Sequence, residues 1–217
     1  MTRAKRVTDV CGSLAGLLAL APLFLLVGIT IAIEGRGGPV FFTQDRVGRD
    51  GVRFRMWKFR TMAVGAEQKG AQLTVGADPR ITAVGRWLRR FKLDELPQLL
   101  NVLRGEMSLV GPRPEVPRYV ELYTEAQRAV LRLVPGITDP ASIRYSDEAA
   151  ELARASDPER YYIDEVMPEK IRLNLEYAAR ATPWSDILVV LSTVGLVAGR
   201  RSRGSETARL TSSTLGA

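Results

Sequence analysis

Residues 10–33 read VCGSLAGLLALAPLFLLVGITIAI and contain no charged side chain. As one straight helix, this run would extend roughly 36 Å, enough to cross a hydrocarbon core of about 30 Å. Basic residues flank it on both sides, with Arg3, Lys5 and Arg6 before the run and Arg36 after it. Because both flanks are basic, the positive-inside rule gives no orientation. The run predicts a membrane-associated helix whose topology stays open.

Pro22 lies near the centre of this run and removes a helical hydrogen bond there. Two half-helices of about 18 Å each would then enter and leave the membrane by the same face, keeping both basic flanks in the cytosol. A kinked spanning helix is the simpler interpretation and is slightly favoured by the run alone. A signal peptide fits less well, because the cleavage-like Ala19-Leu20-Ala21 stands mid-run and is followed by proline.

The composition of the 217-residue chain narrows the classes of function. It is 46% hydrophobic and 25% charged, which excludes disordered, collagen-like and disulfide-scaffold proteins. Its formal net charge of +7 indicates an anionic partner: nucleic acid, a membrane surface or a phosphorylated substrate. The chain has no His, which excludes a His-ligated zinc site, a Ser-His-Asp triad and an imidazole base. Cys11 lies in the apolar run and is predicted to act as a small hydrophobe.

The residues after Pro39 have the pattern of a soluble domain. Strands are predicted over 40–44 and 54–59 with an Asp50-Gly51 turn between them, and helices over 81–91, 94–103, 116–133, 147–155 and 167–181. The apolar segment 186–198 is too short to span a bilayer, and both an interfacial helix and a packed core helix fit it. Residues 200–217 are rich in Ser, Thr, Arg and Gly and are predicted to form a disordered tail.

The stretch RRFKLDELPQ at 89–98 places adjacent carboxylates, Asp94 and Glu95, after three cations. Acidic residues at a helix start complement the helix dipole, and this segment alone favours such a cap. A carboxylate near cations also has a lowered pKa and stays ionised, which suits a nucleophile or a divalent-metal ligand. A phosphate drawn to Arg89, Arg90 and Lys92 would lie beside it.

Two other basic stretches allow a phosphate site. In GPRPE at 111–115, prolines restrict the backbone around Arg113, whose planar fork suits a phosphate, although a rigid turn with Arg113 in solvent fits equally. KFRTM at 58–62 begins with Lys58, and an exposed strand edge is its plain alternative. Each stretch is a weak signal alone.

Together and in this order, the stretches resemble the bacterial sugar transferase family, the small monotopic polyprenyl-phosphate phosphoglycosyl transferases. The resemblance covers roughly Arg3 to Leu196. It is carried by KRxxD at 5–9, GPVFFTQDRVG at 38–48, KFRTM at 58–62, LDELPQ at 93–98, GPRP at 111–114 and PGIT at 135–138.

The resemblance implies an enzyme that moves a sugar 1-phosphate from a UDP-sugar to polyprenyl (undecaprenyl) phosphate in bacterial exopolysaccharide synthesis. By this match Asp94 is the nucleophile, which displaces UMP and carries the phosphosugar covalently, and Glu95 is a Mg²⁺ ligand. Lys58, Arg89 and Arg113 match positions that support the site or bind phosphate. A carboxylate is a known covalent nucleophile, and phosphoryl transfer depends mainly on positioning and charge neutralisation.

The resemblance also implies an α/β fold, mostly helical with a small β-hairpin, and amphipathic helices on the membrane surface. Residues 1–36 would form a re-entrant helical hairpin broken at Pro22, 37–199 a catalytic domain on the cytosolic face of the bacterial inner membrane, and 200–217 the tail. This topology replaces the spanning helix favoured by the run alone. The chain departs from the family pattern at Ala21, where Ser is frequent, and at two C-terminal positions, Asp139 in place of Gly and Asn174 in place of Asp.

Three other classes compete with the transferase. A membrane-anchored nucleotide-sugar hydrolase would use the same carboxylates and Mg²⁺ with water as acceptor. A nucleic-acid-binding protein would explain the charge, but the basic residues are not interleaved with aromatic residues in a known pattern. A non-catalytic membrane scaffold has no need of Asp94 and Glu95 beside Arg89 and Arg113. The transferase is favoured, with UDP-sugar, polyprenyl phosphate and a phospholipid membrane as partners and no nucleic acid.

Overall fold

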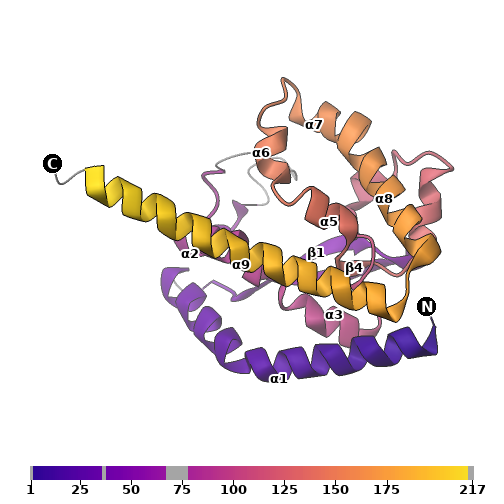
Figure 1. The fold of residues 1–217 in the computed structure, drawn as a ribbon, viewed down its shortest axis with the longest axis horizontal. Coiled ribbons are helices and arrows are strands. Elements are labelled where there is room, and N and C mark those ends of the chain that lie inside the picture. The colour runs from indigo at the N-terminus through magenta and orange to yellow at the C-terminus, as the bar shows by residue number, and fades with distance from the viewer. Residues whose placement is uncertain (1, 36–37, 67–77, 215–217) are drawn as a thin grey trace.

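A computed structural model describes residues 2–35, 38–66 and 78–214, with side chains as far as residue 199. Its first element is α1 (Arg3–Glu34), a long helix that contains Pro22 and bends part-way along its length (Figure 1). A proline inside a helix is a common cause of such a bend. In the described part of the chain, α1 is the helix long and apolar enough to cross a membrane. The helix continues through Pro22, and the re-entrant hairpin stays a prediction.

The KRxxD motif attaches the start of α1 to the rest of the protein. Lys5 forms an ion pair of 2.5 Å with Asp186, at the start of the last helix. Arg6 donates to the carbonyls of Val102 and Leu103 at 2.5 and 2.8 Å. Buried Asp9 accepts from the Ser108 hydroxyl and the Leu109 amide, both at 3.0 Å. Three side chains near the N-terminus therefore fix α1 against segments about 100 residues or more away.

The predicted hairpin is confirmed, with both strands longer than expected. Strand β1 (Phe41–Val47) pairs antiparallel with β2 (Arg53–Phe59), and Thr43 lies opposite Trp57. The short helical turn η1 (Arg49–Gly51) joins them, with Asp50 and Gly51 at φ 56° and 79°. Asp and Gly tolerate this left-handed conformation, which is why the dipeptide marks the turn.

The central segment positions the acidic pair. Helix α2 (Ala83–Arg90) is followed by the 3₁₀ turn η3 (Leu93–Glu95) and by α3 (Gln98–Arg104). The predicted helix over 94–103 is wrong at its start, because α3 begins only after Pro97 and the acidic pair lies in the separate turn before it. Strand β3 (Ser108–Val110) then pairs in parallel with β4 (Gly136–Thr138).

The predicted helix over 116–133 is also wrong. The chain forms the short helix α4 (Pro117–Val120) and then the 3₁₀ helix η4 (Gln127–Arg132). Between them the Thr124 amide donates to Gln127 Oε1 at 2.8 Å, and the Gln127 amide donates to Thr124 Oγ1 at 3.3 Å. This reciprocal capping starts a new helical segment and interrupts the helical spacing.

The chain after β4 is helical. It contains α5 (Pro140–Arg144), α6 (Glu148–Leu152), α7 (Pro158–Tyr161), the π turn η5 (Tyr162–Val166), α8 (Met167–Arg180) and α9 (Pro183–Thr214). Helices expected over 147–155 and 167–181 are confirmed with shorter ends. The backbone of α9 stays helical through Thr214, and the predicted disorder of 200–217 stays a prediction. The mostly helical α/β class with small sheets is confirmed.

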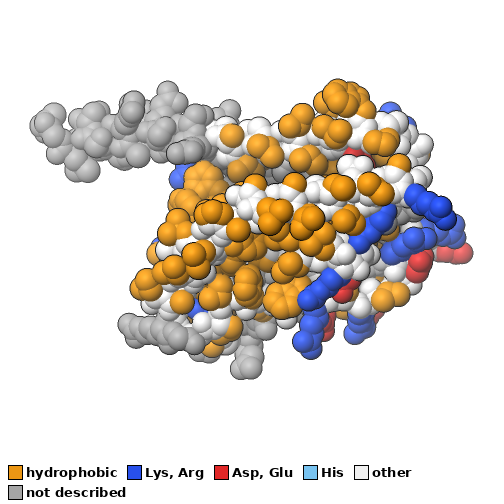
Figure 2. Space-filling view, turned by 90° about the horizontal axis from the view of Figure 1, so that it is seen from below, with side chains coloured by type: hydrophobic (Ala, Val, Ile, Leu, Met, Phe, Trp, Pro, Cys, Tyr) orange, Lys and Arg blue, Asp and Glu red, His pale blue; other side chains and the backbone are white. Residues whose placement is uncertain are grey.

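Helices α1 and α9 expose an apolar surface. Figure 2 shows hydrophobic side chains gathered over one side of the molecule, with Lys and Arg grouped at one end. Exposed apolar side chains in these helices are Val7, Leu14, Leu18, Leu25, Leu26, Ile29 and Ile33 in α1, and Trp184, Ile187, Leu188, Leu191 and Val194 in α9. Exposure on this scale marks membrane or partner contact. The interfacial interpretation of 186–198 therefore fits better than a packed core helix.

Candidate active site

The acidic pair lies in a tight turn between two helices. Lys92 adopts the left-handed conformation at φ 54° and reverses the chain after α2, so that Asp94 and Glu95 follow in η3. Asp94 is 6% exposed, and its Oδ1 has no hydrogen-bond partner. Among the described residues, neither η3 nor α3 has a side-chain N-cap hydrogen bond. Neither carboxylate therefore caps a helix through a side-chain hydrogen bond, although both lie in the first turn of η3.

Glu95 and Arg113 form a two-pronged ion pair. Arg113 Nη2 donates to Glu95 Oε1 at 2.5 Å and Nη1 donates to Oε2 at 3.1 Å, with the side chains 25% and 12% exposed. The loop carrying Arg113 starts at Gly111, where a Cβ would lie 2.3 Å from the Val134 carbonyl oxygen, so this close approach of β3 and β4 requires glycine. The interpretation of Arg113 as a side chain in solvent is wrong.

The two adjacent carboxylates have opposite pKa shifts. Burial raises the pKa of Asp94, and the charge of Glu95 raises it further, against weaker opposition from Lys58, Lys92 and Arg89. For Glu95, burial also acts upward, but Arg113 above all, with Lys92 and Lys58, holds its pKa well below the usual value. The lowered pKa expected near cations is confirmed for Glu95 and wrong for Asp94, because burial dominates at Asp94.

Lys58 and Arg89 come to the same site from separate elements. Lys58 is on β2, and burial, followed by repulsion from Arg113, lowers its pKa to about 7. Arg89 is on α2, where its Nε donates to Thr61 Oγ1 at 2.9 Å. Gly85 allows this packing, because a Cβ there would lie 2.0 Å from the Thr61 carbonyl oxygen. All five predicted site residues, Lys58, Arg89, Asp94, Glu95 and Arg113, line one cavity.

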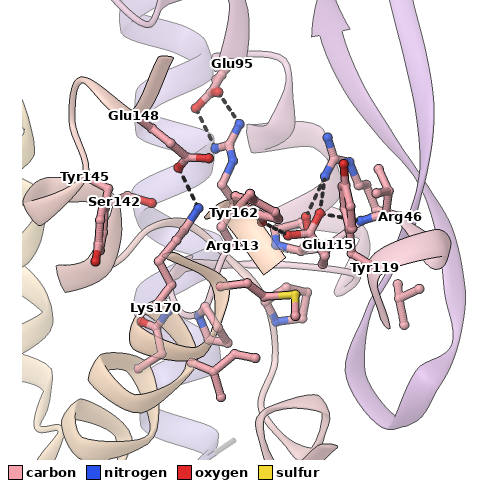
Figure 3. Close-up of a pocket in the computed structure, with 18 of the residues that line it drawn as sticks. Arg46, Glu95, Arg113, Glu115, Tyr119, Ser142, Tyr145, Glu148, Tyr162 and Lys170 are labelled. Atoms are coloured by element: carbon pink, nitrogen blue, oxygen red, sulfur yellow. Dashed lines mark hydrogen bonds and ion pairs between the residues drawn. The ribbon is translucent and has the colours of Figure 1, made fainter. Parts of the chain in front are cut away.

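This cavity has a volume of about 710 Å³, within the usual range for ligand sites. Eight cationic and five carboxylate side chains line it, which favours an anionic ligand. Sequence reasoning missed its other wall, drawn in Figure 3, which is formed by Arg46, Glu115, Tyr119, Ser142, Tyr145, Glu148, Tyr162 and Lys170. Arg46 belongs to a motif already noted. Glu115 ends the GPRPE stretch that was also noted, and the remaining six have no local pattern that separates them from ordinary helix residues.

The profile of the bacterial sugar transferase family matches residues 1–200. The chain belongs to this family. It is 41% identical over 197 residues to an undecaprenyl-phosphate glucose phosphotransferase of Komagataeibacter xylinus, covering 88% of this chain and 35% of that protein. It is 36% identical to a UDP-glucose:undecaprenyl-phosphate glucose-1-phosphate transferase of Caulobacter vibrioides, covering 88% and 68%. It is 35% identical to the exopolysaccharide production protein ExoY of Rhizobium meliloti, covering 93% and 88%.

Several relatives of this sugar transferase chain are much longer than it is. The chain spans about a third of the Komagataeibacter protein and 42% of the galactosyl transferase CpsE of Streptococcus agalactiae. The shared part holds all the motifs described above, since the family match runs from residue 1 to 200.

The three departures from the family pattern lie in different surroundings. Asp139 is 1% exposed and caps α5, accepting from the Ser142 amide at 2.9 Å and the Ser142 hydroxyl at 2.5 Å. Asn174 is buried on α8 and lines the cavity. Ala21 is exposed in α1 directly before Pro22. Asp139 therefore has a local structural role, since N-cap carboxylates satisfy free helix amides.

The carboxylate pair of this sugar transferase chain fits a Mg²⁺ ion. Asp94 Oδ1 is a buried carboxylate oxygen without a partner, and Glu95 keeps lone pairs beyond the two that accept from Arg113. No cluster of three or more His, Cys, Asp or Glu side chains occurs in the described parts of the chain. Mg²⁺ commonly binds through one or two carboxylates, with substrate phosphate and water as its other ligands.

Proposed function

We propose that this chain transfers a sugar 1-phosphate from a UDP-sugar to undecaprenyl phosphate and releases UMP. The observation that carries the proposal is the buried Asp94, whose Oδ1 has no partner, in a cation-lined cavity beside the Glu95–Arg113 pair. The names of the Komagataeibacter and Caulobacter relatives describe transfer of this kind to undecaprenyl phosphate. A family relation alone does not fix an activity, and the site supplies the specific argument.

The first step forms a bond from Asp94 to the sugar-bearing phosphorus of the donor. The bond between that phosphorus and the bridging oxygen breaks, and UMP leaves with the electron pair. Lys58 and Arg89 lie where they would bind the diphosphate oxygens, and Arg113 holds Glu95 in place. Burial that desolvates the Asp94 carboxylate also strengthens its electrostatic contacts with the reacting group.

In the second step, a phosphate oxygen of undecaprenyl phosphate bonds to the same phosphorus. The bond to Asp94 breaks, which restores the carboxylate and yields undecaprenyl-diphospho-sugar. Asp94 and Glu95 would hold Mg²⁺. When bound, the ion supplies charge neutralisation that keeps the carboxylates compatible with an anionic donor.

The apolar surface of α1 and α9 would place this cavity at a membrane, where the lipid acceptor resides. Arg3, exposed at the start of α1, suits an anionic cytosolic leaflet, whereas Lys5 and Arg6 have partners within the protein. We therefore assign residues 1–36 to a membrane anchor and 37–199 to a catalytic domain on the cytosolic face of the bacterial inner membrane.

The test measures UMP released from a panel of UDP-sugars with Mg²⁺, with and without undecaprenyl phosphate. Asp94→Asn is compared with wild type and with Asp164→Asn, a control that removes an exposed carboxylate paired with Arg160 outside the cavity. Lipid-dependent release that falls at least about 10³-fold only in Asp94→Asn supports the proposal.

A second readout follows phosphorus-labelled sugar phosphate retained on the protein without acceptor. Wild type and Asp164→Asn should be labelled and Asp94→Asn should not. Release of UMP at the same rate without lipid would identify a hydrolase instead. Activity in Asp94→Asn equal to that of wild type would overturn the assigned nucleophile.

A further inference from the structure

The two ends of the cavity have different chemistry. At one end, Lys58, Arg89 and Lys92 lie close to the acidic pair and favour phosphate. The opposite wall consists of helices α5, α6 and α8 with the π turn η5, and its charged side chains are the Lys170–Glu148 ion pair and the neighbouring carboxylate Asp147. Glu148 at the start of α6 binds Lys170 on α8 at 2.7 Å. The phosphate chemistry described above makes no use of this wall.

The Lys170–Glu148 pair is held at a fixed place. Its side chains are only 14% and 27% exposed, and Lys170 Nζ lies 5.5 Å from the ring centre of Tyr162. The Tyr162 hydroxyl donates to Glu115, which fixes the ring. Tyr162 belongs to a π turn, and such turns often occur at functional sites.

The pair also lies next to the catalytic residues. Figure 3 shows Arg113 with Glu95 on one side and with Glu148 and Lys170 on the other. Glu148 is also one of the groups that raise the pKa of Arg113, after the larger effect of Glu95. In the proposed reaction the attacked phosphorus bears the sugar through a single oxygen. The sugar must therefore lie within a few ångströms of the acidic pair, on the side that the diphosphate leaves open.

The chemistry of the pair suits a sugar. Lys170 uses one of its three N–H donors on Glu148 Oε2, and Glu148 Oε1 has no hydrogen bond to any described residue. A donor and an acceptor side by side match neighbouring hydroxyls of a hexose, each of which both donates and accepts. A phosphate at the same place would be repelled by the negative charge of Glu148, whereas an uncharged sugar would not be repelled.

We propose that Lys170 and Glu148 bind the hydroxyls of the donor sugar and determine which hexose is accepted. The proposal rests on the proposed function and names the part of the substrate that this wall recognises. Hydrogen bonds to charged groups contribute enough to change the preference between two sugar epimers by roughly 10- to 100-fold.

The experiment measures kcat/KM for UDP-glucose, UDP-galactose and UDP-N-acetylglucosamine, together with inhibition by UMP. The variants are Lys170→Met and the exchanged pair Lys170→Glu with Glu148→Lys. The matched control is Arg172→Met on the same helix, an exposed cation with two carboxylate partners outside the cavity. Glu148→Gln, which keeps an acceptor for Lys170, serves if either charge variant fails to fold.

The exchanged pair separates recognition from structure. If the pair only joins α6 to α8, the exchanged pair regains any stability that Lys170→Met loses. The ratios of kcat/KM between donors then stay at their wild-type values. If the pair recognises the sugar, the exchange retains folding but changes these ratios roughly 10- to 100-fold, while inhibition by UMP stays as in wild type.

Three results would overturn the proposal. Unchanged donor ratios in all folded variants would reduce the pair to a structural role. Inhibition by UMP that weakens as much as kcat/KM for every donor would assign the wall to the uridine. Equal changes in Arg172→Met would show that the effect is not specific to the cavity. Lipid-dependent UMP release by wild type, measured in the same assays, shows separately whether the proposed function holds.

Discussion

Replacing Arg113 by Met should destabilise the protein through Glu95. The substitution leaves a carboxylate that is 12% exposed without either of its two hydrogen bonds, at 2.5 and 3.1 Å. Breaking a buried ion pair by removing one partner costs about 3–5 kcal/mol, and the partial exposure of Arg113 reduces this to about 2–4 kcal/mol. For a chain of this length, that loss lowers Tm by about 5–15 °C.

The loss should depend on pH in a defined direction. In wild type the pKa of Glu95 is lowered, so its stabilisation is complete above the unfolded-state pKa and is lost as the pH falls below it. In Arg113→Met, the cation that lowers the pKa of Glu95 most is absent, so burial raises this pKa in the folded variant. As the pH falls, Glu95 therefore takes up a proton in the folded variant before it does so in the unfolded chain. The difference in Tm between the two proteins should therefore be largest near pH 8 and narrow toward pH 5.

The assay is thermal unfolding in detergent, followed by circular dichroism, at pH 5 to 8. Arg172→Met is the control, because it removes an arginine that also binds two carboxylates but is 53% exposed. Its loss should be below about 1 kcal/mol at every pH. A constant Tm difference for Arg113→Met across this range, or one no larger than that of the control, would refute the reasoning.

Three further predictions concern other parts of the protein. Lys58→Met should abolish transfer and raise Tm at pH 7 by a few degrees, because the pKa of Lys58 is lowered to about 7 and its charge is therefore unfavourable in the folded protein. As the pH rises from 7 to 10, folded Lys58 loses its proton before the unfolded chain does, so the Tm of wild type should rise. The same melts of the variant should lack this rise. Asp139→Ala should cost about 1–2 kcal/mol in denaturant unfolding, and combining it with Ser142→Ala should add less than the sum, because the two side chains share their hydrogen bonds. Leu18→Arg, at a position 70% exposed on α1, should move the protein from the membrane to the soluble fraction of fractionated cells, whereas Leu122→Arg outside α1 and α9 should not.

The Glu95–Arg113 pair joins residues 18 positions apart, and it forms only because β3 and β4 meet at Gly111 and direct the following loop toward η3. The sequence predicted that prolines fix Arg113 but left its direction open. Local restraint limits a backbone, whereas the partner of a side chain depends on which distant segments pack together.

The opposite wall of the cavity depends even more on contacts between distant segments. Glu148 and Lys170 are ordinary charged residues of two helices, and no local pattern distinguishes them from Arg172 or Glu176, which face solvent. Only the packing of α6 and α8 around η5 brings the pair beside Arg113. Long-range convergence of this kind leaves no signal in spacing or composition.

The sequence by itself determined the apolar N-terminal helix, the hairpin with its Asp-Gly turn, and the motifs that carry the family and the acidic pair. These features depend on hydrophobic length, turn chemistry and residue order, all of which are local. Only the tertiary structure decided that the two carboxylates have opposite pKa shifts and that Lys170 and Glu148 face the site. Burial and contacts between distant segments set these properties, because the free energy of a charge depends on its surroundings in space and not on its neighbours in the chain.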